Sequence, residues 1–166
     1  MVLKDGGNSG KGLFRGVDWT KTRAYAVGFN SIFLNLKGRE NEGIVKPEQA
    51  SYLKEELAKN LSTLKDDEIY VIDKISDAEK NGKLENLGNK PDLIAGYTKN
   101  YRCSWQSAIG GVGDNLVFEA NKKKWSGDHC CNPIKVPGVI FSSEKLSADK
   151  ISVLDIRDLV GSQIGK

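Results

Sequence analysis

Apolar positions recur along this chain with two different periods, which divide it into expected strands and helices. RAYAVGF at 23–29 and SIFLNL at 31–36 are short apolar runs separated by Asn30, a turn-prone residue. This pattern predicts two neighbouring strands. Further along, four leucines recur at spacings of four and three, which predicts a helix over 47–66: Leu53, Leu57, Leu61 and Leu64. Pro47 suits the first turn of that helix, because a helix start needs no backbone donor there.

The remaining apolar stretches predict further strands and a last helix. EIYVIDKISD at 68–77 is rich in β-branched residues, and PDLIAGY at 91–97 begins with a proline that a strand start tolerates. VPGVIFSS at 136–143 has the composition of a buried strand. We expect a short strand followed by a Gly-rich loop over 101–115, and helical spacing predicts a helix over 151–165.

These elements predict an α/β fold with a mixed sheet and few helices. Residues 1–12 are Gly-rich without periodicity, which is typical of a flexible N-terminal arm, and 13–166 then form a single α/β domain. A sheet that is buried on both faces needs more helical cover than two helices provide. The sequence therefore suggests a part of a larger fold.

Composition and charge narrow the possible partners. Hydrophobic residues make up 39% and charged residues 28%, and the net charge is only +3. This mild basicity does not imply a nucleic acid polymer as partner. The run Lys122 to Lys124 is interpreted as a solvated loop, with attraction of an anionic substrate as the alternative. No apolar run approaches the roughly 18 residues of a membrane helix, so we expect no membrane partner and a cytoplasmic location.

The segment KWSGDHCCNPIKVPGVIFSS at 124–143 holds the single histidine, His129. An imidazole on a Gly-containing loop suits a zinc ligand that Asp128 could orient, although a surface histidine is the alternative. A structural zinc site with Cys103, Cys130 and Cys131 is disfavoured, because such sites space their ligands in pairs. His129 could not easily activate the adjacent Cys130 thiol, and no G-x-S-x-G motif supports a serine nucleophile.

Three segments resemble, in the same order, the C-terminal part of the type I phosphodiesterase/nucleotide pyrophosphatase family of the alkaline phosphatase superfamily. They are VDWTKTRAYAVGFNSIFLNLKGRENEGIV, PDLIAGYTKNYRCSWQSAIGG and KWSGDHCCNPIKVPGVIFSS. The resemblance implies an alkaline-phosphatase-like fold and a hydrolase in which two metal ions, commonly zinc, clamp the reacting oxygens. It also implies that His129 in SGDH is one metal ligand, with Asp128 ordering the loop around it.

The chemistry of three further side chains suggests roles in substrate binding. Lys37 and Arg39 in LNLKGRE are candidate phosphate binders, while salt bridges from this loop to Glu40 or Glu42 are the open alternative. Trp125 could stack on a base or an aromatic leaving group, or could fill the base of the loop.

Two hypotheses follow for the function. In the first, the chain is the C-terminal portion of a metal-dependent phosphodiesterase acting on a phosphodiester or nucleotide. It would be inactive alone, because it lacks the nucleophile and most metal ligands, and would need the missing N-terminal half in cis or in trans. In the second, the chain is a non-catalytic α/β module that serves in binding or assembly.

Overall fold

The computed structural model describes residues 1–4, 13–78, 90–111, 117–124, 130–143, 145–146 and 151–164. The chain divides into two compact units, residues 1–136 and 137–166. The predicted N-terminal arm and single domain over 13–166 stay predictions. Within the first unit, Leu3 pairs with Val17 as an isolated antiparallel bridge.

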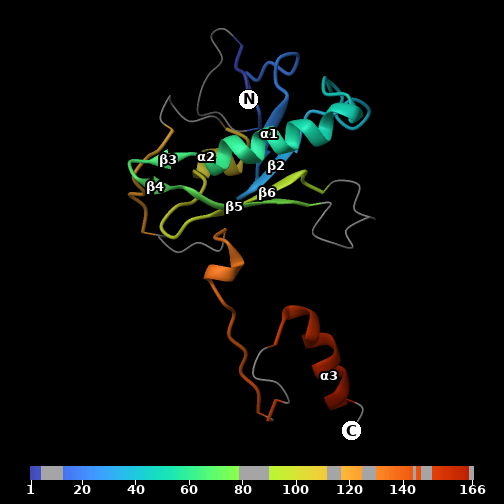
Figure 1. The fold of residues 1–166 in the computed structure, drawn as a ribbon, viewed down its shortest axis with the longest axis vertical. Helices are drawn as coiled ribbons and strands as arrows, with labels where there is room; N and C mark the ends of the chain where they lie inside the picture. Colours follow the sequence, from blue (N-terminus) through green and yellow to red (C-terminus); the bar gives the residue numbers. More distant parts are fainter. Residues whose placement is uncertain are drawn as a thin grey trace. The chain divides into compact units, whose positions relative to one another are not determined.

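A four-stranded antiparallel sheet forms the centre of the first unit (Figure 1). Its strands in spatial order are β1 (Ala24–Val27), β2 (Ser31–Leu34), β6 (Leu93–Tyr97) and β5 (Ile72–Asp77). The β1–β2 pair confirms the two strands that the sequence predicts around Asn30. Gly28 adopts a φ of +77° at the start of their connection, a conformation that glycine tolerates best.

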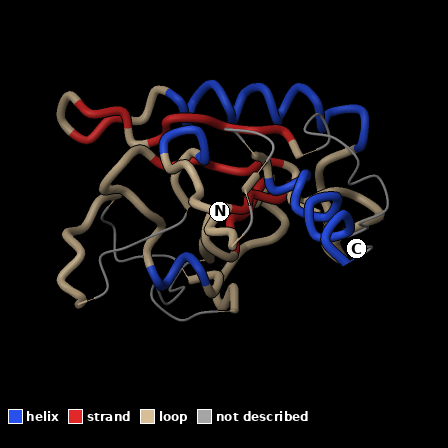
Figure 2. The backbone as a smooth tube through the Cα atoms, turned by 90° about the horizontal axis from the view of Figure 1, so that it is seen from below, coloured by secondary structure: helices blue, strands red, loops and turns tan. Residues whose placement is uncertain are grey.

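Helix α1 (Ala50–Ser62) lies along one face of the sheet, as Figure 2 also shows. A 3₁₀ turn, η1 (Pro47–Gln49), leads into it, so the predicted helix start at Pro47 is confirmed. Leu53 is buried against Leu34 and Val45. Burial of one such side chain stabilises the fold by about 1.5–3 kcal/mol. Lys54 of α1 and Asp77 of β5 form an ion pair of 2.9 Å whose side chains are largely buried.

The first unit contains a second apolar cluster. It contains buried Val71, Ile72 and Ala95, against which Tyr101 and Phe118 pack. A two-stranded hairpin of β3 (Lys65–Asp66) and β4 (Ile69–Tyr70) precedes this cluster in the chain. The hydroxyl of Tyr101 donates to Oδ2 of Asp66 at 3.0 Å, which joins the hairpin to the loop after β6.

The segment 101–111 differs from its prediction. Helix α2 (Trp105–Ala108) stands where we expected a short strand and a loop. Ser104 caps this helix, because its Oγ accepts the backbone N–H of Ser107 at 3.1 Å. The local cap therefore outweighs the strand preference of the neighbouring aromatic residues.

The stretch around 131–143 also differs from expectation. Cys131 pairs with Tyr97 as an isolated bridge, and η2 (Pro133–Lys135) follows. The predicted buried strand over 136–143 is wrong, because the segment is extended and exposed. Val139 is 79% exposed and Phe141 is 93% exposed.

The second unit ends in a short helical segment, as predicted. It comprises η3 (Val153–Asp155) and α3 (Ile156–Ile164). Ser152 and Asp155 cap its start reciprocally, since Ser152 Oγ accepts the N–H of Leu154 at 2.9 Å and Asp155 Oδ2 accepts the N–H of Ser152 at 2.7 Å. Taken element by element, the chain is a mixed α/β protein with a small antiparallel sheet and few helices.

Candidate functional site

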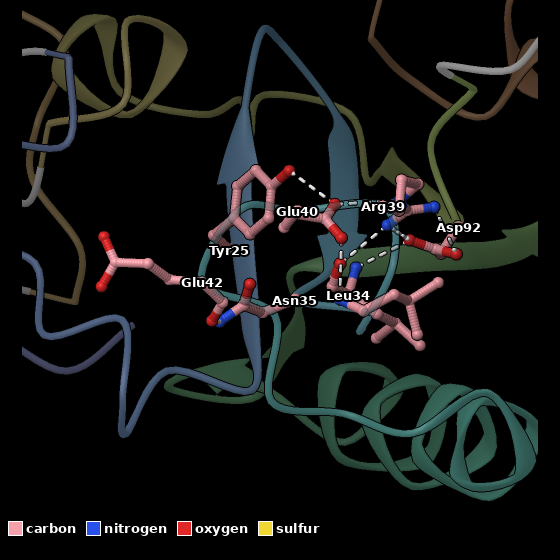
Figure 3. A network of polar contacts seen from close by, with 8 residues as sticks. Tyr25, Leu34, Asn35, Arg39, Glu40, Glu42 and Asp92 are labelled. Carbon is pink, nitrogen blue, oxygen red and sulfur yellow. Dashed lines mark hydrogen bonds and ion pairs between the residues drawn. The ribbon is translucent and has the colours of Figure 1, made fainter.

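A network of polar side chains joins the loop after β2 to the residue before β6 (Figure 3). The Nη2 atom of Arg39 lies 2.7 Å from Oδ2 of Asp92 and 2.7 Å from the carbonyl oxygen of Leu34. The same Asp92 oxygen accepts the backbone N–H of Leu34 at 2.7 Å. The Arg39 and Asp92 side chains are 26% and 10% exposed, so solvent screens this ion pair only weakly.

Glu40 extends the network to β1. Its Oε1 atom accepts the Nε–H of Arg39 at 2.8 Å and the hydroxyl of Tyr25 at 3.1 Å. Burial, and then the charge of Glu40 and this hydrogen bond, raise the pKa of Tyr25 to about 12. Tyr25 is therefore a neutral hydrogen-bond donor at physiological pH.

Asn35 holds the same loop from the other side. Its side chain is fully buried, and Nδ2 donates to the carbonyl oxygens of Thr22 at 2.9 Å, Trp19 at 3.1 Å and Glu42 at 3.1 Å. A buried amide that binds main-chain carbonyls fixes the course of the chain around it. The loop over 35–45 is thus ordered by its own side chains.

The structure places the predicted phosphate binders in this loop. The guanidinium of Arg39 donates to Asp92, to Glu40 and to the Leu34 carbonyl, and Figure 3 shows it turned toward them. The side chain of Lys37 is exposed. The sequence left open a salt bridge from this loop to Glu40 or to Glu42, and the structure shows the one from Arg39 to Glu40. The main-chain carbonyl of Glu42 accepts a hydrogen bond from Asn35. A binding role for Lys37 and Arg39 stays a prediction.

The predicted zinc ligand His129, together with Asp128 and Trp125, lies outside the described residues. Their roles, and the zinc ion itself, therefore stay predictions. In the part of the chain that the structure describes, no group of three or more His, Cys, Asp or Glu side chains could hold a metal ion. The three cysteines all belong to this part and are thiols rather than disulfide partners: Cys103, Cys130 and Cys131.

A cluster of cations around an exposed aromatic ring forms a second polar centre. Trp105, the first residue of α2, is 40% exposed. The Cζ atom of Arg102 lies 4.4 Å from the centroid of the Trp105 ring, and Nζ of Lys123 lies 5.4 Å from it. Phe29, from the β1–β2 connection, meets the same ring edge-on with centroids 6.5 Å apart. Three separate segments therefore converge on one indole.

A surface hollow adjoins this cluster. Arg102 lines it together with Lys99, Asn100, Tyr101, Asn121 and Cys131. Its volume is about 380 Å³. Among the described residues of the lining, the charged side chains are both cationic, and Asp66 comes near only as the acceptor of the Tyr101 hydroxyl. The described lining of the hollow thus carries two cationic side chains, Lys99 and Arg102.

Sequence reasoning missed Trp105 and Arg102. The only local signal is an arginine three positions before a tryptophan, and Arg102 lies outside α2, before its N-cap Ser104. Lys123 belongs to the run that the sequence alone suggests is a solvated loop. Its approach to Trp105 is a tertiary contact, and such contacts leave no periodic trace in the sequence.

The comparisons with known proteins give a short partial match. The chain is similar to large ribosomal subunit protein bL9 of Buchnera aphidicola subsp. Baizongia pistaciae (strain Bp), with 44% identity over 45 residues. The aligned stretch covers 25% of this chain and 29% of that protein. No protein-family model matches the chain, and no solved structure matches it.

This similarity corrects the predicted family. The assignment to the type I phosphodiesterase/nucleotide pyrophosphatase family, and with it the hydrolase function, is contradicted, because the match is to a ribosomal protein. The expected phosphodiester or nucleotide substrate is contradicted on the same ground. So is the exclusion of nucleic acid as a partner, since a ribosomal subunit is built on RNA.

The LKGRE-x-EGIV segment is part of the resemblance to the phosphodiesterase family, and the structure gives several of its residues a structural role. Gly38 has a φ of +87°, and a Cβ atom on Gly43 would lie 2.0 Å from the carbonyl oxygen of Leu36. Arg39 and Glu40 are engaged in the ion pairs described above. The backbone thus favours glycine at positions 38 and 43, and Arg39 and Glu40 have structural roles in the loop.

The structure bears on the expected absence of a membrane partner only through the helices that it describes. Within the described residues, none of the helices combines the length and the apolar character that a bilayer crossing requires.

Proposed function

We propose that this chain is a non-catalytic binding module that assembles with the RNA of a large ribosomal subunit, in the cytoplasm. The similarity of 45 residues to a large ribosomal subunit protein carries the proposal. It is the alternative that the sequence left open, now with a partner of stated chemistry.

The charge distribution of the first unit supports an RNA partner. Lys99 and Arg102 line one hollow, and Lys123 lies at the Trp105 ring beside it. Lys122 and Lys124 flank Lys123 and are exposed. Phosphate groups bind such clustered cations with release of counterions, so this surface would bind RNA even though the net charge of the chain is small.

The internal polar network supports a non-catalytic role. Arg39 and Asp92 neutralise each other, and Glu40 is paired with Arg39 and Tyr25. A catalytic acid or base must be free to exchange a proton with a substrate. Groups committed to one another in this way stabilise a fold instead.

Co-sedimentation of the purified chain with purified large ribosomal subunits tests the proposal. We expect saturable binding that weakens steeply as salt rises, because phosphate contacts dominate. The double variant Lys99→Glu/Lys123→Glu should lose at least tenfold in affinity. A matched control, Lys46→Glu/Lys74→Glu, changes the charge equally at exposed positions elsewhere and should bind almost as the wild type does.

Absence of binding at low salt would overturn the proposal. Equal losses in the two double variants would also contradict it, because they would mean that net charge rather than this surface governs the association.

A further inference from the structure

We infer that Trp105 is the stacking residue of a binding site for single-stranded RNA, in which one unpaired base lies against the indole and the adjoining phosphates meet Arg102 and Lys123. The inference rests on the proposed function in taking RNA as the partner. It adds that the RNA is single-stranded and that Trp105 binds one of its bases.

The position of the indole is the first step. Trp105 is held at the start of α2 by the Ser104 cap, and the edge-on contact with Phe29 restrains its ring. The α2 segment is itself tied to the β1–β2 connection, because Gly28 N–H donates to the Ala108 carbonyl at 2.9 Å. The ring is nevertheless 40% exposed. A restrained, exposed aromatic ring loses little entropy when a base stacks on it.

The cations are the second step. The guanidinium of Arg102 lies at a stacking distance from the ring, and its plane can support a base as an aromatic ring does. Lys123 is more distant from the ring and lies on an exposed segment. Its compact ammonium group can leave the ring for a phosphate oxygen when a base arrives. Base stacking and phosphate neutralisation are thus available at one place.

The adjoining hollow is the third step. Lys99 offers a second charge, and the side-chain amide of Asn100 lines the same hollow, while Oδ1 of Asn121 accepts the backbone N–H of Lys123 at 3.1 Å. A hollow of about 380 Å³ is near the lower end of the range for small-ligand sites. It could take a single nucleotide that continues from the stacked base.

This combination distinguishes single strands from a duplex. In a duplex the bases are stacked on each other and their faces are inaccessible, so a protein contacts mainly phosphates and sugars. A cationic surface alone would serve that purpose. An exposed indole with cations near it is useful for a base whose face is free.

The test is equilibrium binding of the full chain to an unstructured ten-nucleotide RNA and to a duplex of equal length, with tryptophan fluorescence as a second readout. We expect Trp105→Ala to weaken single-strand binding about tenfold, in keeping with the loss of one stacked base. Duplex binding should change less than twofold. Trp105→Tyr should restore most of the affinity, because it keeps an aromatic face.

Tyr52→Ala serves as the matched control, because Tyr52 is 70% exposed on α1 and lies outside the cluster. It should leave both affinities unchanged. Circular dichroism of each variant establishes that the fold is retained, and the recovery in Trp105→Tyr separates a stacking role from a folding role.

The outcomes separate the inference from the proposed function. If the chain binds large ribosomal subunits but Trp105→Ala binds single strands as the wild type does, the inference fails and the proposed function stands. If single strands bind through Trp105 while large subunits do not bind, the proposed function fails. An equal loss on single strands and duplex would overturn the stacking role.

Discussion

Arg39 and Asp92, 53 positions apart in the chain, are joined by two hydrogen bonds of 2.7 and 3.2 Å. The bonds run from the two terminal nitrogens of the guanidinium to the two oxygens of the carboxylate. This geometry fixes the loop after β2 against the entrance to β6. Because Asp92 also accepts the N–H of Leu34, the pair closes around the end of β2.

Asp92→Asn should lower the free energy of unfolding by about 2–3 kcal/mol, since it leaves Arg39 without its charged partner in a largely buried place. Urea unfolding followed by circular dichroism measures the change. The exposed pair Lys65–Glu68, at 3.5 Å, offers the control: Glu68→Gln should cost less than about 0.5 kcal/mol. Equal effects in the two variants would contradict the structural role of the Arg39–Asp92 pair.

Gly43→Ala should destabilise the protein strongly, because the new Cβ would lie 2.0 Å from the main-chain oxygen of Leu36. Neither partner is a flexible side chain, so the backbone itself must move, at a cost of at least about 2 kcal/mol. Gly138→Ala is the control, since nothing lies within 4 Å of the position that its new methyl group would take. The melting temperatures of both variants, measured by thermal unfolding, test this prediction. An unchanged melting temperature in Gly43→Ala would show that the loop is packed differently.

Tyr25 should titrate well above the ordinary value of a tyrosine. Its folded-state pKa of about 12 exceeds the ordinary value of 10.0, so the folded protein holds this proton more tightly than the unfolded chain does. The stability that this provides is fully present below pH 10 and is lost as the pH rises from about 10 to about 12.

The absorbance of tyrosinate, compared between the wild type and Tyr25→Phe, isolates this titration. Glu40→Gln should lower the pKa of Tyr25, because it removes a negative charge that disfavours the phenolate. The shift should be incomplete, since burial is the larger cause. Titration of Tyr25 at the ordinary value in the wild type would be incompatible with the hydrogen bond to Glu40.

The purified chain should not hydrolyse a chromogenic phosphodiester, with or without added zinc. The reason is that the corrected family assignment removes the basis for a two-metal hydrolase, and that Arg39 is committed to Asp92 and Glu40. Rate measurements at saturating substrate provide the test. Zinc-dependent turnover that disappears in His129→Ala would restore the hydrolase interpretation.

Much of the sheet and the main helix could be predicted from the sequence. The leucine spacing in α1 and the turn-prone Asn30 report local geometry directly, because side chains at helical spacing must share a face. The apolar residues over 136–143 predict a strand, yet a strand needs a neighbouring strand for its hydrogen bonds. Sequence composition cannot say whether such a neighbour exists.

The candidate site was harder to predict than the fold. Arg39 is conspicuous for its chemistry, but its partner Asp92 lies 53 positions away, and only the fold reveals that its donors are already used. Conversely, Trp105 is a candidate binding residue because Lys123 and Phe29, from other segments of the chain, lie against its ring. Pairwise tertiary contacts of this kind define the candidate sites, and periodicity in a single sequence does not reveal them.

The most direct test of the proposed function is sedimentation of the tagged chain with a mixture of separated large and small ribosomal subunits at physiological salt. We expect the chain to migrate with the large subunit and to remain at the top of the gradient when only small subunits are present. Migration with neither subunit, or equally with both, would contradict assembly with the large ribosomal subunit.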